Sequence, residues 1–189
     1  MEKTAVQKLA GALKVLVTIT LVCNLVALLL VPGMSLMKGP EEHLALTPYE
    51  NPLEVPLRVG IAFVLSWGWV WTAGVYEVVL ALFLLFCGIC TAVILWQGRR
   101  VLGTILTGAP FRAENGVSLR RAAVCCFLIA AAALARVVWG LFYYGSVAPL
   151  LTYNALFVPI FILGGLLCLV MSALFRQAAE LKAENDLTI

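Results

Sequence analysis

Long apolar runs alternate with polar segments along the whole chain. Four runs are long enough to cross the roughly 30 Å hydrocarbon core of a bilayer as helices, which takes about 20 residues each. They cover about residues 9–31, 74–97, 116–142 and 150–175. The pattern therefore predicts an all-α membrane protein, in which residues 1–189 form one transmembrane domain built as an antiparallel bundle of four transmembrane helices.

The segment 32–73 breaks this pattern. Pro32-Gly33 follows the first run and is expected to end its helix, and further prolines and glutamates make the next residues polar and rich in turns. Val55–Phe63 alternates loosely and contains many β-branched residues, which favours a short β-strand. Three tryptophans then suit a membrane–water interface: Trp67, Trp69 and Trp71. We expect residues 32–73 to form a small extracytoplasmic cap.

Composition supports the membrane assignment and narrows the chemistry. Hydrophobic residues make up 63% of the chain and charged residues 12%, and the mean hydropathy is +1.03, whereas soluble domains are about half apolar and a quarter charged. His43 is the only histidine, which excludes a multi-histidine metal site. Because no P-loop, dinucleotide fingerprint or Ser/His/Asp set is present, we expect a non-enzymatic protein without a metal or cofactor.

Lysine and arginine predict the orientation, because they concentrate in cytoplasmic segments close to the membrane. They occur before the first run, in the loop 98–115 and in the tail 176–189. These segments are therefore predicted to be cytoplasmic, together with both termini. Val101–Leu106 is expected to continue the second helix as an amphipathic turn, and Asn115 is expected to cap the third helix.

Two charges, Glu77 and Arg136, lie well inside predicted spans, and an unpaired charge in lipid costs several kcal/mol. Both positions fall in the outer half of the bilayer, so we predict an intramembrane ion pair or a polar pocket. The alternative is that Glu77 is interfacial and Arg136 extends outward to the headgroups. A small oligomeric transporter or pore lined by Arg136, Glu77 and Asn24 is a second functional hypothesis.

The cysteines suggest a third hypothesis. Cys87-Gly88-Ile89-Cys90 has the C-x-x-C spacing of thiol–disulfide enzymes, so a membrane thiol oxidoreductase is an alternative. These thiols lie near the middle of the bilayer, where an apolar environment disfavours the thiolate, and no cysteine pair lies in an outer loop. Cys125-Cys126 is expected to pack as small apolar residues rather than to bind a soft metal.

Two further patterns concern packing and lipid contact. Gly164, Cys168 and Ser172 repeat every four residues, and such a face of small side chains allows close helix contact. The arginines of the loop 98–115 would attract anionic lipid headgroups, at about 1 kcal/mol for each cation near the surface.

Two stretches resemble a known family. These are Gly108-Ala109-Pro110-Phe111, continued by Asn115 and Leu119-Arg120-Arg121, and the tail Phe175–Ile189. They are similar to the signatures of a small bacterial family of four-helix integral membrane proteins, catalogued as domain of unknown function 2975, although many members have Gly at Ala178 or Ala179. The resemblance implies a bacterial inner membrane and a small helix-turn-helix regulator of the Cro/Xre type as partner, and it supplies no catalytic residues.

The resulting hypothesis is a membrane component of a stress or regulatory system, whose cytoplasmic loop and tail dock a soluble partner. We expect contacts with the bilayer, with anionic headgroups and with such a regulator. A homo-oligomer is a further option, and no direct binding of nucleic acid is expected. The candidate partner or lipid contacts are Arg99, Arg100, Pro110, Phe111, Asn115, Arg120, Arg121, Glu180, Glu184, Asn185 and Asp186.

Overall fold

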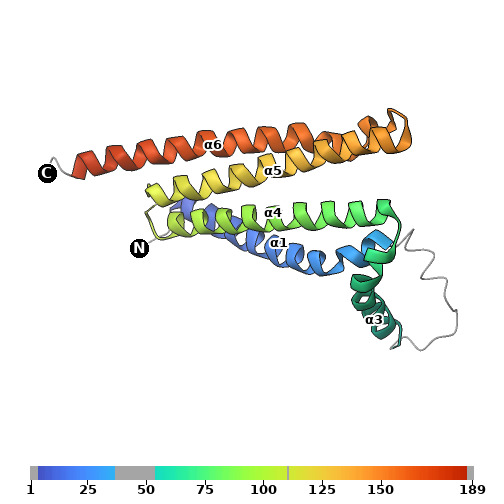
Figure 1. The fold of residues 1–189 in the computed structure, drawn as a ribbon. Helices are drawn as coiled ribbons and strands as arrows, with labels where there is room; N and C mark the ends of the chain where they lie inside the picture. The colour runs from blue at the N-terminus through green and yellow to red at the C-terminus, as the bar shows by residue number, and fades with distance from the viewer. Residues whose placement is uncertain (1–3, 37–53, 110, 187–189) are drawn as a thin grey trace. The chain divides into compact units, whose positions relative to one another are not determined.

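The computed structural model describes residues 4–36, 54–109 and 111–186, and this part of the chain is helical with short connections and contains no strand. Figure 1 shows the elements in chain order: α1 (Ala5–Leu36), α3 (Glu54–Trp69), η1 (Val70–Thr72), α4 (Val75–Leu106), α5 (Ala113–Tyr144), η2 (Ala148–Leu151) and α6 (Tyr153–Asp186). Four helices, α1, α4, α5 and α6, are long and apolar enough to span a membrane. The chain is therefore an all-α, multi-pass membrane protein, as its hydropathy predicts.

The chain divides into two compact units, one formed by Leu25–Phe86 and the other by Met1–Asn24 with Cys87–Ile189. In the Leu25–Phe86 unit, the predicted strand over Val55–Phe63 is wrong, because these residues belong to helix α3. An apolar run in or near lipid has to satisfy its own backbone hydrogen bonds, and a helix does so without a partner strand. The residues 37–53 of the predicted cap lie outside the described residues.

The predicted end of the first helix at Pro32-Gly33 is also wrong, since α1 continues through Pro32 to Leu36. Proline is tolerated inside apolar helices where neighbouring groups compensate for the lost backbone bond. A small core of Val31, Val70 and Ala81 holds this unit together. The Trp67 indole Nε1–H donates to the Leu29 carbonyl at 3.0 Å, so this ring is anchored to α1.

The other unit contains α5 and α6, which lie side by side over most of their length after the tight connection through η2 (Figure 1). The predicted small face of α6 meets α5: Ser172 Oγ donates to the Gly116 carbonyl at 2.7 Å, and a Cβ built on Gly164 would lie 4.0 Å from Cys126 Sγ. The second half of α4 and the first part of α1 belong to the same unit. Asn24 Nδ2 on α1 donates to the Gly88 carbonyl on α4 at 3.0 Å, so this bond joins the two helices.

The connection from α4 to α5 is shorter than predicted. α4 continues past Gln97 to Leu106, so the expected turn over Val101–Leu106 is confirmed as helix. α5 begins at Ala113, and the predicted loop 98–115 contracts to the residues 107–112. The tail 176–189 continues α6 as helix to Asp186, and residues 187–189 lie outside the described part.

Candidate functional site

The α4–α5 connection begins with a hydrogen-bonded cap on α4. Gly108 has φ +74°, its N–H donates to the Ile105 carbonyl, and the Ala109 N–H donates to the Thr104 carbonyl, each at 3.1 Å. These two bonds, with a glycine in the left-handed conformation, form a Schellman motif, which satisfies carbonyls at a helix end. The Gly-Ala start of the signature is therefore a helix terminator that sets where the chain turns back.

Asn115 joins the beginning of α5 to the end of α4. Its side chain is 2% exposed, and its Nδ2 donates to Thr104 Oγ1 at 2.7 Å, while that hydroxyl donates to the Val101 carbonyl at 2.7 Å. The prediction that Asn115 caps α5 is wrong, because Arg112 is the residue that precedes the helix. Asn115 instead lies in the first turn and uses its amide to hold the two helices together.

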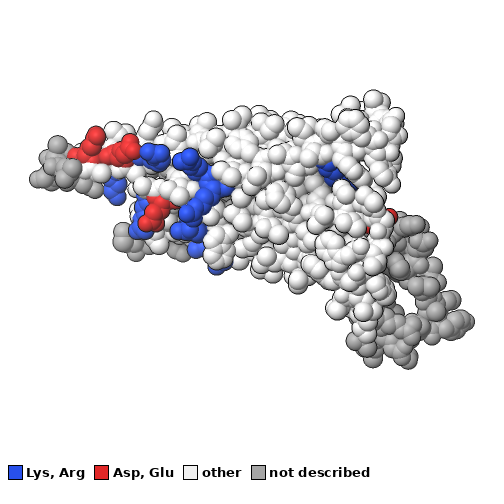
Figure 2. All heavy atoms as spheres, in the orientation of Figure 1, with Lys and Arg blue, Asp and Glu red and all other residues white. Residues whose placement is uncertain are grey.

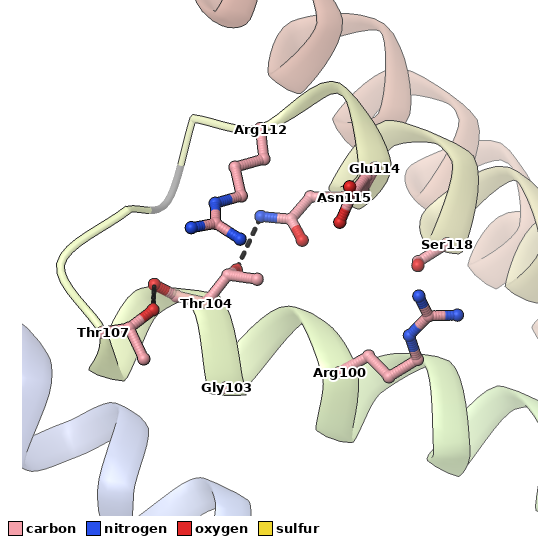
Figure 3. A pocket seen from close by; sticks show the side chains of 8 residues that line it. All are labelled: Arg100, Gly103, Thr104, Thr107, Arg112, Glu114, Asn115 and Ser118. Carbon is pink, nitrogen blue, oxygen red and sulfur yellow. Dashed lines mark hydrogen bonds between the residues drawn. The ribbon is translucent and has the colours of Figure 1, made fainter.

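A cavity of about 250 Å³ opens around this bond. Figure 3 shows the Arg112 guanidinium turned toward Thr104 and Asn115, and the Arg100 side chain extending toward Ser118. The lining comes from the last turns of α4, the connection and the first turns of α5. The lining residues are Arg100, Gly103, Thr104, Thr107, Arg112, Glu114, Asn115 and Ser118.

The cavity is rich in hydrogen-bond donors and carries more positive than negative charge. Arg100 and Arg112 face a single carboxylate, that of Glu114, and neither arginine forms an ion pair with any residue that the structure describes. A third cation lies close by on α1, since a Cβ built on Gly103 would be 3.5 Å from Lys14 Nζ. Figure 2 shows Lys and Arg side chains gathered at this end, over the α4–α5 connection. This arrangement favours an anion.

α6 packs behind the site. Ser172 on α6 donates to the carbonyl of Gly116, the residue that follows Asn115. A Cβ built on Gly116 would lie 2.8 Å from Arg176 Cγ, also on α6. Because a glycine lets the two backbones approach closely, the start of α5 packs tightly against the last apolar turns of α6. The polar extension of α6 therefore leaves the bundle directly beside the cavity.

The predicted contact residues divide between the cavity and its surroundings. Arg100 and Asn115 line the cavity. Arg99 lies 5.9 Å from the Trp96 ring centroid, in a cation–π contact. Phe111, Arg120 and Arg121 are exposed without lining it, Glu180, Glu184 and Asn185 are exposed on α6, and Asp186 ends that helix. Pro110 lies outside the described residues.

The intramembrane charges lie in different units, Glu77 in Leu25–Phe86 and Arg136 with α5. Arg136 Nη1 donates to Asn154 Oδ1 of α6 at 3.3 Å. A Cβ built on Gly74 would lie 2.5 Å from the Glu77 carboxylate, so this side chain folds back along the first turn of α4. An ion pair between Glu77 and Arg136 stays a prediction.

The thiols associate between helices. The thiol of Cys90 on α4 lies close to that of Cys125 on α5, and the thiol of Cys126 lies close to that of Cys168 on α6. Cys87 is half-buried. These contacts fit the expected role of small packing residues, and the thiol oxidoreductase with Cys87 and Cys90 stays an untested alternative.

None of the three hydroxyl side chains that line the cavity was predicted from the sequence. Thr104 follows Arg100 by four residues on one face of α4, Thr107 comes three residues later, directly after the helix ends, and Ser118 follows Asn115 by three on α5. This helical spacing was available as a signal once α4 was known to continue beyond Gln97. Arg112 and Glu114 could not be assigned in this way, because their positions depend on the turn.

Comparison with known proteins gives one match. A family model described as "Protein of unknown function (DUF2975)" matches residues 48–189, which is most of the chain. No curated protein and no solved structure matches.

Proposed function

The chain belongs to the DUF2975 family of proteins of unknown function, and on this premise we propose that it is a non-enzymatic protein of a bacterial cell membrane that docks a soluble regulatory partner. Both termini and the α4–α5 connection are cytoplasmic in this proposal. The partner is a small helix-turn-helix regulator, and the system is one of stress response or regulation. The protein itself does not bind nucleic acid.

The helical extension of α6 is the observation that carries this proposal. The helix continues without interruption beyond its apolar part to Asp186, and its beginning is held against α5 by the contacts of Ser172 and Arg176 with Gly116. Leu181 lies on this polar extension with 66% of its surface exposed. An apolar side chain that a charged helix inserts into a groove is a common means of protein recognition.

The distribution of charge supports the orientation. Figure 2 shows basic side chains over the α4–α5 connection and acidic side chains on the terminal turns of α6, both at the same end of α5 and α6, whereas the rest of the visible face of these two helices carries almost no charge. Lysine and arginine close to spans favour the cytoplasmic side. Reporter fusions to Ile189 would test this, because a cytoplasmic tail makes a green fluorescent fusion bright and an alkaline phosphatase fusion inactive.

The transporter hypothesis receives less support. Asn24 donates to the Gly88 carbonyl and Arg136 donates to Asn154, so two of the three proposed lining residues take part in bonds between helices. Such bonds favour structural roles, because polar side chains join transmembrane helices in this way.

The docking test first searches the neighbouring genes for one that encodes a small helix-turn-helix protein and then co-expresses that protein with this chain. Deletion of residues 178–189 keeps Arg176 in place, and we expect the partner to be lost from the affinity-purified membrane protein. Leu181→Asp should reduce retention at least about tenfold, the loss of roughly 1.4 kcal/mol of binding free energy. Ala183→Asp adds the same charge to an exposed position two residues away and is the matched control. Unchanged retention after the deletion would remove the tail from the proposal.

A further inference from the structure

The cavity at the α4–α5 connection has the chemistry of an anion site. Its two guanidinium groups come from different elements and line the same cavity: Arg112, from the connection, is turned toward the buried amide of Asn115, and Arg100, from α4, extends toward Ser118 (Figure 3). Guanidinium groups bind phosphate oxygens through paired N–H bonds, and hydroxyl groups add further donors. We propose that this cavity binds a singly phosphorylated anionic group.

The volume limits the size of the ligand. The cavity holds about 250 Å³, which is below the roughly 300–1,000 Å³ of typical sites for drug-sized molecules and cofactors. A phosphate group with a short polar substituent fits this space better than a dinucleotide or a folded peptide. Thr104 and Asn115 already bond to each other, so they shape the cavity wall, and the arginines supply the recognition.

The position along α4 points to the depth of lipid headgroups. Trp96 is exposed and lies beneath the Arg99 guanidinium, and this pairing of an aromatic ring and a cation is typical of the membrane–water interface. Arg100 follows Trp96 by four residues, which is about one turn, or 6 Å, farther along the helix axis. An anionic phospholipid headgroup would reach the cavity from the bilayer, and a free phosphate compound would reach it from the water.

The main test compares two pairs of arginines with the same change in net charge. The purified protein in a non-ionic detergent is titrated with phosphatidylglycerol and with phosphatidylcholine, and bound lipid is counted by native mass spectrometry. We expect preference for phosphatidylglycerol, and Arg100→Gln with Arg112→Gln should weaken that binding on the order of 30-fold, from about 1 kcal/mol for each cation. Arg120→Gln with Arg121→Gln changes exposed residues outside the cavity and should alter the affinity less than about threefold.

A second set of variants protects the test against misfolding of the glutamine pair. Arg100→Lys with Arg112→Lys keeps the charge and loses the paired N–H geometry, so binding should fall by an intermediate factor of about five. Glu114→Gln removes the only carboxylate of the lining and should tighten binding by about fivefold. Glu180→Gln, on the exposed extension of α6, is its matched control and should leave the affinity unchanged.

Soluble anions distinguish the two sources. Glycerol phosphate and inorganic phosphate are titrated calorimetrically into the same preparation. If phosphatidylglycerol binds and the soluble anions do not, the result supports a lipid site. If the soluble anions bind and Arg100→Gln with Arg112→Gln abolishes that binding, the result supports a soluble ligand. Equal losses in the two glutamine pairs, or no preference for any of these anions, would overturn the proposal. The inference is independent of the soluble partner, because the cavity variants leave Leu181 and the α6 extension intact.

Discussion

The helices α5 and α6 pack against each other but differ in how many of their residues are buried. They are nearly equal in length, 32 and 34 residues. α6 buries Gly165 and Ser172 among its described residues and exposes a row of large side chains. α5 buries a longer series of mostly small residues: Asn115, Gly116, Ser118, Ala122, Ala123, Cys126, Ile129, Ala130, Ala133, Val137 and Gly140.

The difference shows what holds transmembrane helices together. Lipid tails are as apolar as leucine, so a large side chain of α6 gains little free energy by turning from lipid to protein. Contact is stabilised instead by close packing and by hydrogen bonds, both of which need small or polar residues at the point of approach. The two buried residues of α6 are such points: Ser172 bonds to the Gly116 carbonyl, and Gly165 faces the ring of Phe127.

The largest expected effect comes from truncating a large side chain inside α5. Ile129 is 1% exposed, and Ile129→Ala should lower the free energy of unfolding by about 3 kcal/mol, because the neighbouring helices lose packing contacts and a cavity remains. Leu167 on α6 is 66% exposed, and Leu167→Ala should cost less than about 0.5 kcal/mol because lipid replaces the lost contacts. Unfolding in mixed micelles, followed by circular dichroism, measures both. Similar losses would mean that α6 is covered by another protein surface.

Filling the closest approach between the helices should be almost as costly. At Gly116 a Cβ would lie 2.8 Å from Arg176 Cγ and 3.0 Å from the Ser172 carbonyl, and the backbone oxygen cannot move without shifting α6. Gly116→Leu should therefore destabilise by about 2 kcal/mol. Gly98→Leu on α4 is the matched control, since among the described residues no atom beyond its chain neighbours and the adjacent backbone of its own helix lies within 4 Å of a Cβ there. A tolerated Gly116→Leu would contradict the tight α5–α6 contact.

The helices themselves were predictable because the hydrophobic run decides whether a segment spans a bilayer. Their ends were less predictable. Arg99 and Arg100 mark the end of the predicted span, and α4 continues over Val101–Leu106, as expected, to the Schellman motif at Gly108, where a glycine with positive φ stops it. At Val55–Phe63, β-branched residues suggested a strand, but helix α3 satisfies the backbone locally.

The candidate site was predictable in its location and charge and less so in its contacts. Arg100 and Asn115 could be selected because the loop between two spans is basic and polar. The partner of Asn115 is Thr104, and which side chains meet across the α4–α5 connection depends on the turn between the two helices, so that bond could not be derived from the sequence. Likewise, spacing predicted the small face of α6, but the bond from Ser172 to Gly116 depends on which helix lies opposite.

Removing the hydrogen bond between the helices should have a moderate effect. Ser172→Ala deletes the donor to the Gly116 carbonyl and should cost about 1 kcal/mol, within the range measured for bonds between transmembrane helices. Thr91→Val is the control, because the Thr91 hydroxyl donates to the Cys87 carbonyl of its own helix and joins no second element. A larger loss for Thr91→Val than for Ser172→Ala would show that the contact depends on shape alone.

The smallest expected effect has the opposite sign. Gln97 on α4 is 7% exposed, and its Oε1 accepts no hydrogen bond from the residues that the structure describes, whereas the equally buried Ser172 has a partner. An unsatisfied buried acceptor costs about 1–3 kcal/mol. Methionine has a similar size and no such acceptor, so Gln97→Met should remove part of this cost and stabilise the protein by about 0.5–1 kcal/mol. The same unfolding titration measures it. A destabilising Gln97→Met would mean that a donor from solution or lipid reaches the Gln97 Oε1. Close packing would then explain the contact between α5 and α6 but not the burial of Gln97 on α4.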